Sequence, residues 1–454
     1  MEGENMNTPS EDIKDAGLSA KLKKRLIKVL DVLTQHPLSS ILSATGSRSQ
    51  AKAAYRMLAN DGFNIDEINK AYANATVERI AEHETVLLIQ DTTTNNLNGH
   101  KKTKGLGYCD EFNMGALIHT CMAITPAGIP LGILAQKIDT RPERKDTSVS
   151  KDVKKKRPIE EKESYRWIET LNEVNSLIPS TVNAINICDR EGDFYEFYAS
   201  AVASDYKVLV RLVHNRNIQD HQKSLDYIKT ISPCGTIDTI IPRDTRRGIK
   251  SRKVTLEISF TSITFKKPDK RSEVHLPSEI TATAIHVKEQ EPPKGIEAIE
   301  WFLLTTESVN TFDDAVRIIQ YYVQRWKIER FHYVLKEGCQ VEKVQERTFE
   351  RQSSMIFLCS MIAVYIMALT YMSRIVPDTD CSVMFEDEEW KVLYSAANKT
   401  KETPEKSYTL KEAVQYLAKL GRSAGAPSDG EPGVKVIWRG LEVLWTLVEY
   451  RDYI

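Results

Sequence analysis

The chain lacks the cysteine patterns of zinc ribbons and of disulfide-rich folds. Its 454 residues include seven cysteines, an odd number, and no two of them form a Cys-x-x-Cys pair. A zinc ribbon needs closely spaced pairs of thiolates, and a disulfide framework needs an even number of partners. The sequence therefore argues against both kinds of site, and scattered cysteines are typical of a reducing cytoplasm.

The chain also has almost no net charge and no apolar leader. Its formal net charge is -1, so a nucleic-acid binder would have to concentrate its cations locally. Residues 1–16 are polar and acidic, unlike a signal peptide. One apolar run, residues 355–372, is near the lower length limit for a membrane span. A buried core helix gives the same pattern, and its position behind an amphipathic helix favours that alternative.

Cations are concentrated near the N-terminus. Residues 20–60 hold eight cations against one acid, Asp31, which gives a local net charge of +7. Leucines and isoleucines recur there at helical spacing, which predicts a small helical, basic module. A solvated helix face is the alternative, but the scarcity of acids favours DNA binding. The cations are Lys21, Lys23, Lys24, Arg25, Lys28, Arg48, Lys52 and Arg56.

Short apolar runs begin at about residue 85 and alternate with helical patterns. They predict strands at 85–93, 115–124, 130–138, 184–189 and 206–213, with helices at 164–177 and 194–203. Alternating runs at 253–260 and 281–287 indicate a β-rich stretch over about 215–300. A helix is expected over 313–338, and the tail ends in an amphipathic helix at 436–454. These patterns predict an α/β core with helical regions at both ends.

Two aspartates stand at the ends of predicted strands. Asp91 ends the run TVLLIQD, and Asp189 ends AINICD. Acids at the ends of buried strands can converge at one edge of a sheet. A helix N-cap or a turn is the commoner role for such an aspartate, so neither residue is decisive alone.

A third acid lies in a more informative pattern. Four residues form a stripe along one predicted helix: Tyr322, Arg325, Glu329 and Lys336. The last three follow Tyr322 by three, seven and fourteen positions. At about 100° per residue, the four side chains lie within an arc of roughly 60°. Such a stripe suits a site where Glu329 binds a metal ion while the cations hold phosphates. Three carboxylates are suitable ligands for two Mg²⁺ ions about 3.5–4 Å apart, which can drive phosphoryl transfer without a protein nucleophile.

These motifs resemble those of the DDE transposases of the insertion-sequence-four family, in the branch that includes the transposase of transposon five. The family signature Y-x2-R-x3-E-x6-K is complete in the stripe from Tyr322 to Lys336. The motifs around the first two acids, DTT and DRE-x-D, are present at 91–93 and 189–193. Three motifs in order are a much stronger signal than any one of them. The sequence departs from the closest relatives at Arg330, where they have a second acid.

The resemblance implies a fold and a division into domains. We expect a ribonuclease H-like catalytic core at 76–375, interrupted by the β-rich insertion at about 215–300. A helical DNA-binding domain is expected at 1–75, and a helical C-terminal domain at 376–454 is expected to dimerise. The likeness is faint beyond about Ser395, so dimer geometry is the least secure implication.

The resemblance also implies roles for single residues. Asp91, Asp189 and Glu329 would be the catalytic acids and would hold Mg²⁺ or Mn²⁺, two ions in each active site. Trp301 matches a tryptophan that stacks on a flipped base, although a core position is the alternative. Arg211 matches an arginine near the DNA end but could face solvent, and His332 could touch the site or only pack. The DNA contacts expected in total are Tyr322, Arg325, Lys336, Trp301, Arg211, His332 and Arg190.

The function expected from the resemblance is cut-and-paste transposition. The enzyme would bind terminal inverted repeats, pair two ends in a homodimeric synaptic complex, cleave through a hairpin and join the 3′ ends to target DNA. It would work in the bacterial cytoplasm, at the nucleoid, without a membrane. The alternatives are a DNA-binding repressor that has lost catalysis and a nuclease of ribonuclease H-like fold that does not transfer strands. The presence of all three acids disfavours the repressor.

Overall fold

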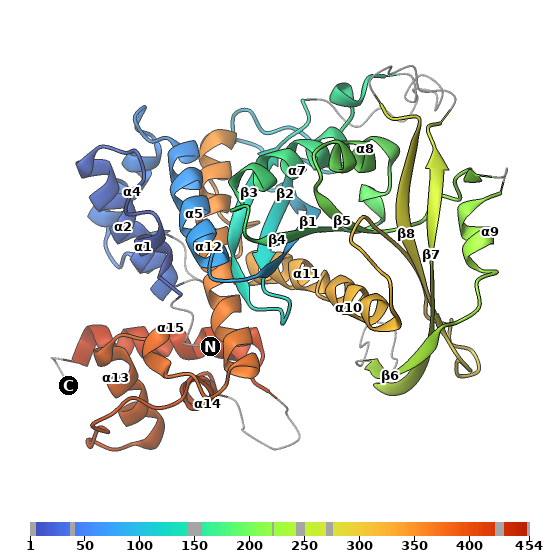
Figure 1. Cartoon of the computed structure of the whole chain (residues 1–454). Coiled ribbons are helices and arrows are strands. Elements are labelled where there is room, and N and C mark those ends of the chain that lie inside the picture. Colours follow the sequence, from blue (N-terminus) through green and yellow to red (C-terminus); the bar gives the residue numbers. More distant parts are fainter. Residues whose placement is uncertain are drawn as a thin grey trace.

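The structure is a computed structural model in which a central sheet carries helices on both faces (Figure 1). One group of helices lies at the N-terminal end of the chain, and another lies at the C-terminal end. The residues that the structure describes are 6–36, 41–142, 157–219, 222–241, 250–268, 276–422 and 431–451.

The described strands form one nine-stranded sheet in the order β3-β2-β1-β4-β5-β9-β8-β7-β6. The first three strands along the chain form antiparallel hairpins, and β4 and β5 then add in parallel beside β1. The predictions for these five strands are confirmed to within a few residues. Their bounds are β1 (Thr85–Asn96), β2 (Gly115–Ile124), β3 (Pro130–Asp139), β4 (Asn183–Cys188) and β5 (Lys207–Arg211).

The β-rich stretch extends this sheet instead of forming a separate one. Strand β9 (Glu300–Thr305) pairs antiparallel with β5 on one side and with β8 on the other. The outer strands then continue the same sheet beyond β9. These strands are β6 (Gly235–Ile241), β7 (Arg252–Lys266) and β8 (Glu279–Glu289), and the short helix α9 (Ser224–Ile228) packs beside them.

Helices cover the two faces of the sheet according to the alternation of apolar side chains along β1. Leu87 and Ile89 belong to the core that contains α10 (Phe312–Val323), α11 (Trp326–Tyr333) and α12 (Phe349–Ile375). Val86 and Leu88 belong to the core under α7 (Tyr165–Leu177). Helix α8 (Tyr195–Ala203) lies on the same side as α7 (Figure 1). Alternate residues of β1 therefore face different helical layers.

The apolar run at 355–372 lies inside α12. By length and composition this helix could cross a membrane, but 94% of its most apolar window is buried within the fold. Figure 1 shows α12 crossing the molecule between the N-terminal helices and the sheet. Burial inside the protein accounts for the composition of this helix.

Helices form both terminal regions. The apolar face of α2 packs against α12 and α15, while the lysines and arginines Lys21, Lys24, Lys28, Arg48, Lys52 and Arg56 are exposed. The N-terminal helices are α1 (Pro9–Asp12), α2 (Ala20–Gln35), α3 (Ile41–Ala44), α4 (Arg48–Leu58) and α5 (Ile65–Ile80). The C-terminal helices are α13 (Asp387–Asn398), α14 (Leu410–Leu420) and α15 (Val434–Tyr450).

Candidate active site

The first two acids lie side by side because of the register between β1 and β4. These strands are parallel, and Ile89 is the partner of Ile187. Asp91 and Asp189 each follow two residues later, so both acids reach the same edge of the sheet on the face that α11 covers. Asp189 also caps the short helix at 190–192, where its Oδ1 accepts a hydrogen bond from Glu191 N at 2.7 Å. Asp189 therefore caps this short helix and also lies at the edge of the sheet that Asp91 reaches.

The Asp91 carboxyl lies in an environment that opposes its ionisation. Burial raises its pKa to about 7, and the negative charge of Asp189 acts in the same direction. The positive charge of Arg325 offsets only part of this effect. A half-buried carboxyl that is repelled by a second carboxylate is typical of sites that bind cations.

The helical stripe is not carried by one continuous α-helix, and the prediction of a single helix over 313–338 is wrong. Helix α10 begins with a capping box between Thr311 and Asp314 and ends at Val323. The next turn tightens, because Arg325 N donates to Tyr322 O at 3.0 Å and Ile328 N to Arg325 O at 3.1 Å, before α11 continues. The chain then widens into a π-helical turn, Val334–Gly338.

Despite these irregularities, the first part of the stripe is assembled as a unit. Arg325 Nη2 lies 2.8 Å from Glu329 Oε1, and its guanidinium stacks on the rings of Tyr322 and Trp326, with distances to the centroids of 6.0 and 5.0 Å. The Arg325 side chain is 10% exposed, whereas that of Glu329 is 41% exposed. In this structure the third acid is therefore paired with an arginine of its own helix.

His332 lies beside Asp91, and Lys336 follows it four residues later in the chain. The His332 Nδ1 atom lies 3.7 Å from Asp91 Oδ2. Burial, together with the charge of Lys336, lowers the pKa of His332 to about 3, so the ring is neutral at physiological pH. Burial also lowers the pKa of Lys336, which lies inside the π turn.

Trp301 and Arg211 lie on the same face of the sheet as the acids. The Trp301 ring meets the Tyr322 ring edge-to-face, with centroids 5.8 Å apart. Trp301 lies two residues before Leu303 in β9, and Arg211 lies two residues after Leu209 in β5. Both leucines belong to the core below α10 and α11, so Trp301 and Arg211 lie on that face of the sheet. Burial raises the pKa of the Tyr322 hydroxyl, the charges of Arg325 and Arg211 lower it, and Asp189 raises it.

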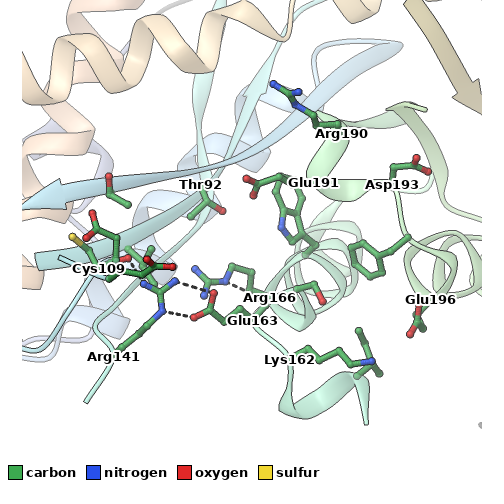
Figure 2. A pocket seen from close by; sticks show the side chains of 18 of the residues that line it. Thr92, Cys109, Arg141, Lys162, Glu163, Arg166, Arg190, Glu191, Asp193 and Glu196 are labelled. Atoms are coloured by element: carbon green, nitrogen blue, oxygen red, sulfur yellow. Dashed lines mark hydrogen bonds and ion pairs between the residues drawn. The ribbon is translucent and has the colours of Figure 1, made fainter. Parts of the chain in front are cut away.

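Arg190 is separated from this group. It is exposed, and it lines a cavity of about 820 Å³ together with Thr92, Arg141, Arg166 and Trp167 (Figure 2). Thr92 points from β1 into this cavity, whereas Asp91, its neighbour in the strand, faces the opposite side of the sheet. The structure thus groups Asp91, Asp189, Glu329, Tyr322, Arg325, His332, Lys336, Trp301 and Arg211 on one face and places Arg190 at the other.

The carboxylates are close together but do not form a finished cation site. Across the described ranges, no three His, Cys, Asp or Glu side chains lie near enough together to hold a metal ion. In this structure Glu329, the third acid, is paired with Arg325. Asp91, whose pKa is raised, and Asp189 supply the carboxylate oxygens that a hard cation requires.

Sequence reasoning quoted Asp193 within the DRE-x-D motif but gave it no task. Its buried carboxylate accepts hydrogen bonds from Val213 N at 2.7 Å, His214 N at 2.8 Å and Tyr198 Oη at 3.0 Å. Arg216 Nη1 forms an ion pair with the same carboxylate at 2.5 Å. Asp193 therefore ties the segment after Asp189 to the segment after Arg211. The only sequence signal was an acid at a fixed distance from the second catalytic candidate.

Three family models match the chain. A transposase DNA-binding model matches residues 13–63, a transposase DDE domain matches 138–366, and a transposase Tn5 dimerisation domain matches 361–454. The first range contains the exposed cations of α2 and α4, so the prediction that 20–60 binds DNA is confirmed. The DDE range includes Asp189 and Glu329 and begins after Asp91.

One similar solved structure is a cryo-EM structure of a piggyBac transposase synaptic complex with hairpin DNA. It is 10% identical, with a TM-score of 0.37, and the alignment covers 100% of this chain and 75% of that one. The DDE model alone covers about half of this chain, and the two Tn5-type or DNA-binding matches flank or overlap it. The chain therefore belongs to the DDE transposases, with the DNA-binding and dimerisation regions of Tn5-like members.

Proposed function

We propose that this transposase cuts and joins DNA at the sheet edge where Asp91 and Asp189 meet, with Glu329 as the third acid. The observation that carries the proposal is the parallel register of β1 and β4, which brings two carboxylates together under α11. A raised pKa of Asp91 supports it, because a nearby cation would relieve the repulsion that raises that pKa.

A DDE catalytic domain uses divalent metal ions. The ions proposed here are Mg²⁺ or Mn²⁺, two in each active site, held by Asp91, Asp189 and Glu329. Bound there, they would polarise the scissile phosphate and lower the pKa of the attacking water or 3′-hydroxyl. To take part, Glu329 must exchange its ion pair with Arg325 for the metal site. That exchange would free the Arg325 guanidinium for a DNA phosphate, which it can grip in a bidentate manner.

The remaining residues on this face would hold the DNA end. Tyr322, Arg325 and Lys336 would contact phosphates, and Arg211 lies beside Tyr322 with a further positive charge. Trp301 would stack on a flipped base, for which aromatic stacking is worth about 1–3 kcal/mol. His332 would pack as a neutral ring beside Asp91, and Arg190 would contact DNA from the opposite face of the edge.

The proposed architecture is a ribonuclease H-like core at 76–375, with an insertion at about 215–300 and terminal domains at 1–75 and 376–454. Its support is the strand order β3-β2-β1-β4-β5, in which an antiparallel meander is followed by parallel strands. The proposed substrate is the terminal inverted repeat of a bacterial element, bound in the cytoplasm at the nucleoid. Two copies would pair two ends through the dimerisation region.

The proposed reaction has four phosphoryl transfers. Water cleaves one strand and leaves a 3′-hydroxyl, and that hydroxyl attacks the opposite strand, which forms a hairpin and releases the flanking DNA. Water reopens the hairpin, and the regenerated 3′-hydroxyl attacks target DNA. Each step breaks one P–O bond and forms another, and no bond to a protein side chain is made.

The deciding experiment compares the wild type with Asp189→Asn on labelled duplexes that end in the inverted repeats flanking the coding region. We expect the wild type with Mg²⁺ or Mn²⁺ to give nicked, hairpin and joined products, and the variant to bind the duplex but give none. Asp205→Asn is a matched control, because this aspartate is exposed and has a positive φ that asparagine tolerates.

The other outcomes separate the alternatives. Hydrolysis without hairpins or joined products would indicate a nuclease, and no cleavage by the wild type with either metal would indicate a DNA-binding repressor. If Asp189→Asn lost both binding and cleavage, Asp189 would be a structural residue and the proposed metal site would be wrong.

A further inference from the structure

The catalytic stripe ends in a π-helical turn that contains Lys336. The turn spans Val334–Gly338, and Cys339 N donates to Val334 O at 3.1 Å, five residues back. Single π turns are rare, and they occur most often at functional positions. A π turn holds about one residue more than an α turn, so its relaxation would rotate the residues within and after it by up to about 100°. The position of Lys336 relative to His332 therefore depends on what maintains this turn.

A tryptophan of the C-terminal region occupies the space beside the turn. A Cβ atom added to Gly338 would lie 1.0 Å from Cη2 and 1.9 Å from Cζ3 of Trp438. Only glycine can occupy this position while the Trp438 ring stays in place. The ring is almost completely buried, and its Nε1 atom has no hydrogen-bond partner among the described residues. Shape, and not a hydrogen bond, therefore fixes the ring against the turn.

Helix α15, which carries Trp438, makes further contacts with the same segment. Lys435 Nζ lies 3.7 Å from Glu337 Oε2 and 5.3 Å from the centroid of the Tyr333 ring. Half-exposed contacts of this kind contribute little stability, but they involve Tyr333 just before the π turn and Glu337 within it. On the other side, Cys339 Sγ donates to Cys359 O of α12 at 3.4 Å.

We propose that Trp438 is a positioning residue for Lys336. By filling the space over Gly338, it maintains the π turn and keeps the Lys336 ammonium near His332. This inference rests on the proposed phosphate contact of Lys336. Trp438 lies in the range matched by the dimerisation domain, so the region that pairs two copies would also set the last cation of the catalytic stripe.

The test enlarges the side chain at position 338 and reduces the side chain at position 438, first separately and then together. We expect Gly338→Ala to flatten the dependence of log K on log salt, for binding to inverted-repeat duplex, by about one unit of slope. Trp438→Phe removes part of the ring without breaking a hydrogen bond and should flatten the slope in the same way. The double variant Gly338→Ala/Trp438→Phe refills the space with a methyl group, and it should restore the wild-type slope and cleavage rate. If the single variants were only misfolded, the double variant would not regain the wild-type slope and cleavage rate.

Three further measurements complete the design. Lys336→Ala should flatten the slope as much as Gly338→Ala, and combining the two should have no further effect. Val443→Ala, on an exposed position of α15, should behave as the wild type. Light scattering should give the wild-type molecular mass for every variant, which separates positioning from loss of dimerisation.

Three results would overturn the inference in different ways. If Lys336→Ala flattens the slope while folded Gly338→Ala and Trp438→Phe do not, the phosphate contact stands and the positioning role is wrong. If Lys336→Ala leaves the slope unchanged, the phosphate contact is wrong, and the inference that depends on it is also wrong. Failure of the double variant to recover would show that Gly338 does not act through Trp438.

Discussion

The Asp91 carboxylate lies where burial and the neighbouring Asp189 both raise its pKa, to about 7. An unfolded aspartate ionises near 3.9, so at neutral pH the metal-free fold must hold a charge that it disfavours. The free energy of unfolding therefore falls as pH rises from about 4 to about 7, because the folded chain keeps the proton longer than the unfolded chain does. At this residue, the arrangement that would bind a cation also costs stability.

We expect Asp91→Asn to stabilise the metal-free protein while abolishing cleavage. The free energy of unfolding should rise by roughly 2–4 kcal/mol at about pH 8 and change little at about pH 4, where the wild-type carboxyl is protonated. Urea unfolding in the presence of a chelator measures both values. Adding Mg²⁺ should stabilise the wild type and not the variant. A variant that is less stable than the wild type at about pH 8 would show that the carboxylate is satisfied within the fold.

Between elements, Asp193 joins the ends of β4 and β5. Burial raises its pKa, but the hydrogen bond with His214 and the charge of Arg216 lower it more, so the net shift is downward. The folded chain therefore gains stability from the ionised form at any pH above the unfolded pKa of about 4. Asp189 and Arg211 precede the two segments that Asp193 joins. The contacts of Asp193 therefore fix one side of the candidate site.

Asp193→Asn should lower the free energy of unfolding by about 3–5 kcal/mol at neutral pH, because Arg216 would be left buried without its counter-ion. The difference from the wild type should narrow only below about pH 4, where Asp193 itself becomes protonated. Urea unfolding across this pH range is the measurement. His214→Ala removes one partner with an exposed side chain and should cost much less. An equal loss in both variants would contradict the central role of the carboxylate.

Several elements could be predicted from the sequence because local patterns determine them. The apolar runs of β1 to β5 and the N-terminal basic helices are examples. The break between α10 and α11 could not be predicted, because Gln324 and Arg325 are ordinary helix formers. The β2–β3 turn packs there, and Gly128, at a φ of +97°, leaves no room for a Cβ beside Gln324. The π turn at Gly338 likewise depends on Trp438, about one hundred residues later.

The sequence named the residues that the structure gathers on one face, apart from Arg190, but it did not predict how they pair. Spacing placed Arg325 and Glu329 on one helix face, where an ion pair four residues apart is as reasonable as two separate tasks. The structure contains the ion pair. The pairing of β9 with both β5 and β8, which brings Trp301 to Tyr322, is a long-range contact that local periodicity does not encode.

At the scale of the whole molecule, the three matched regions share one hydrophobic core. Residues of α2, α12 and α15 belong to a single buried cluster, and α12 lies in both the DDE and the dimerisation ranges. A buried ion pair adds a second link. Arg79 of α5 binds both oxygens of Asp12 of α1, at 2.8 and 3.0 Å, and its Nε donates to Leu131 O of β3. Helix α1, which directly precedes the matched DNA-binding range, is thereby fixed to the sheet.

Burial raises the pKa of Asp12 in spite of the Arg79 contact, whereas the pKa of Arg79 is raised because its contacts with Asp12 outweigh its burial. We therefore expect Arg79→Met alone to lower the free energy of unfolding by about 3–5 kcal/mol, because a buried charge on Asp12 loses its partner. The double variant Asp12→Leu/Arg79→Met should recover most of that loss, since it leaves no unpaired charge. Urea unfolding of the two variants measures the difference. If the double variant were as unstable as the single one, the ion pair itself would be the stabilising link between α1 and the sheet, and the apolar contacts of α2 would be too weak to hold the DNA-binding region in place.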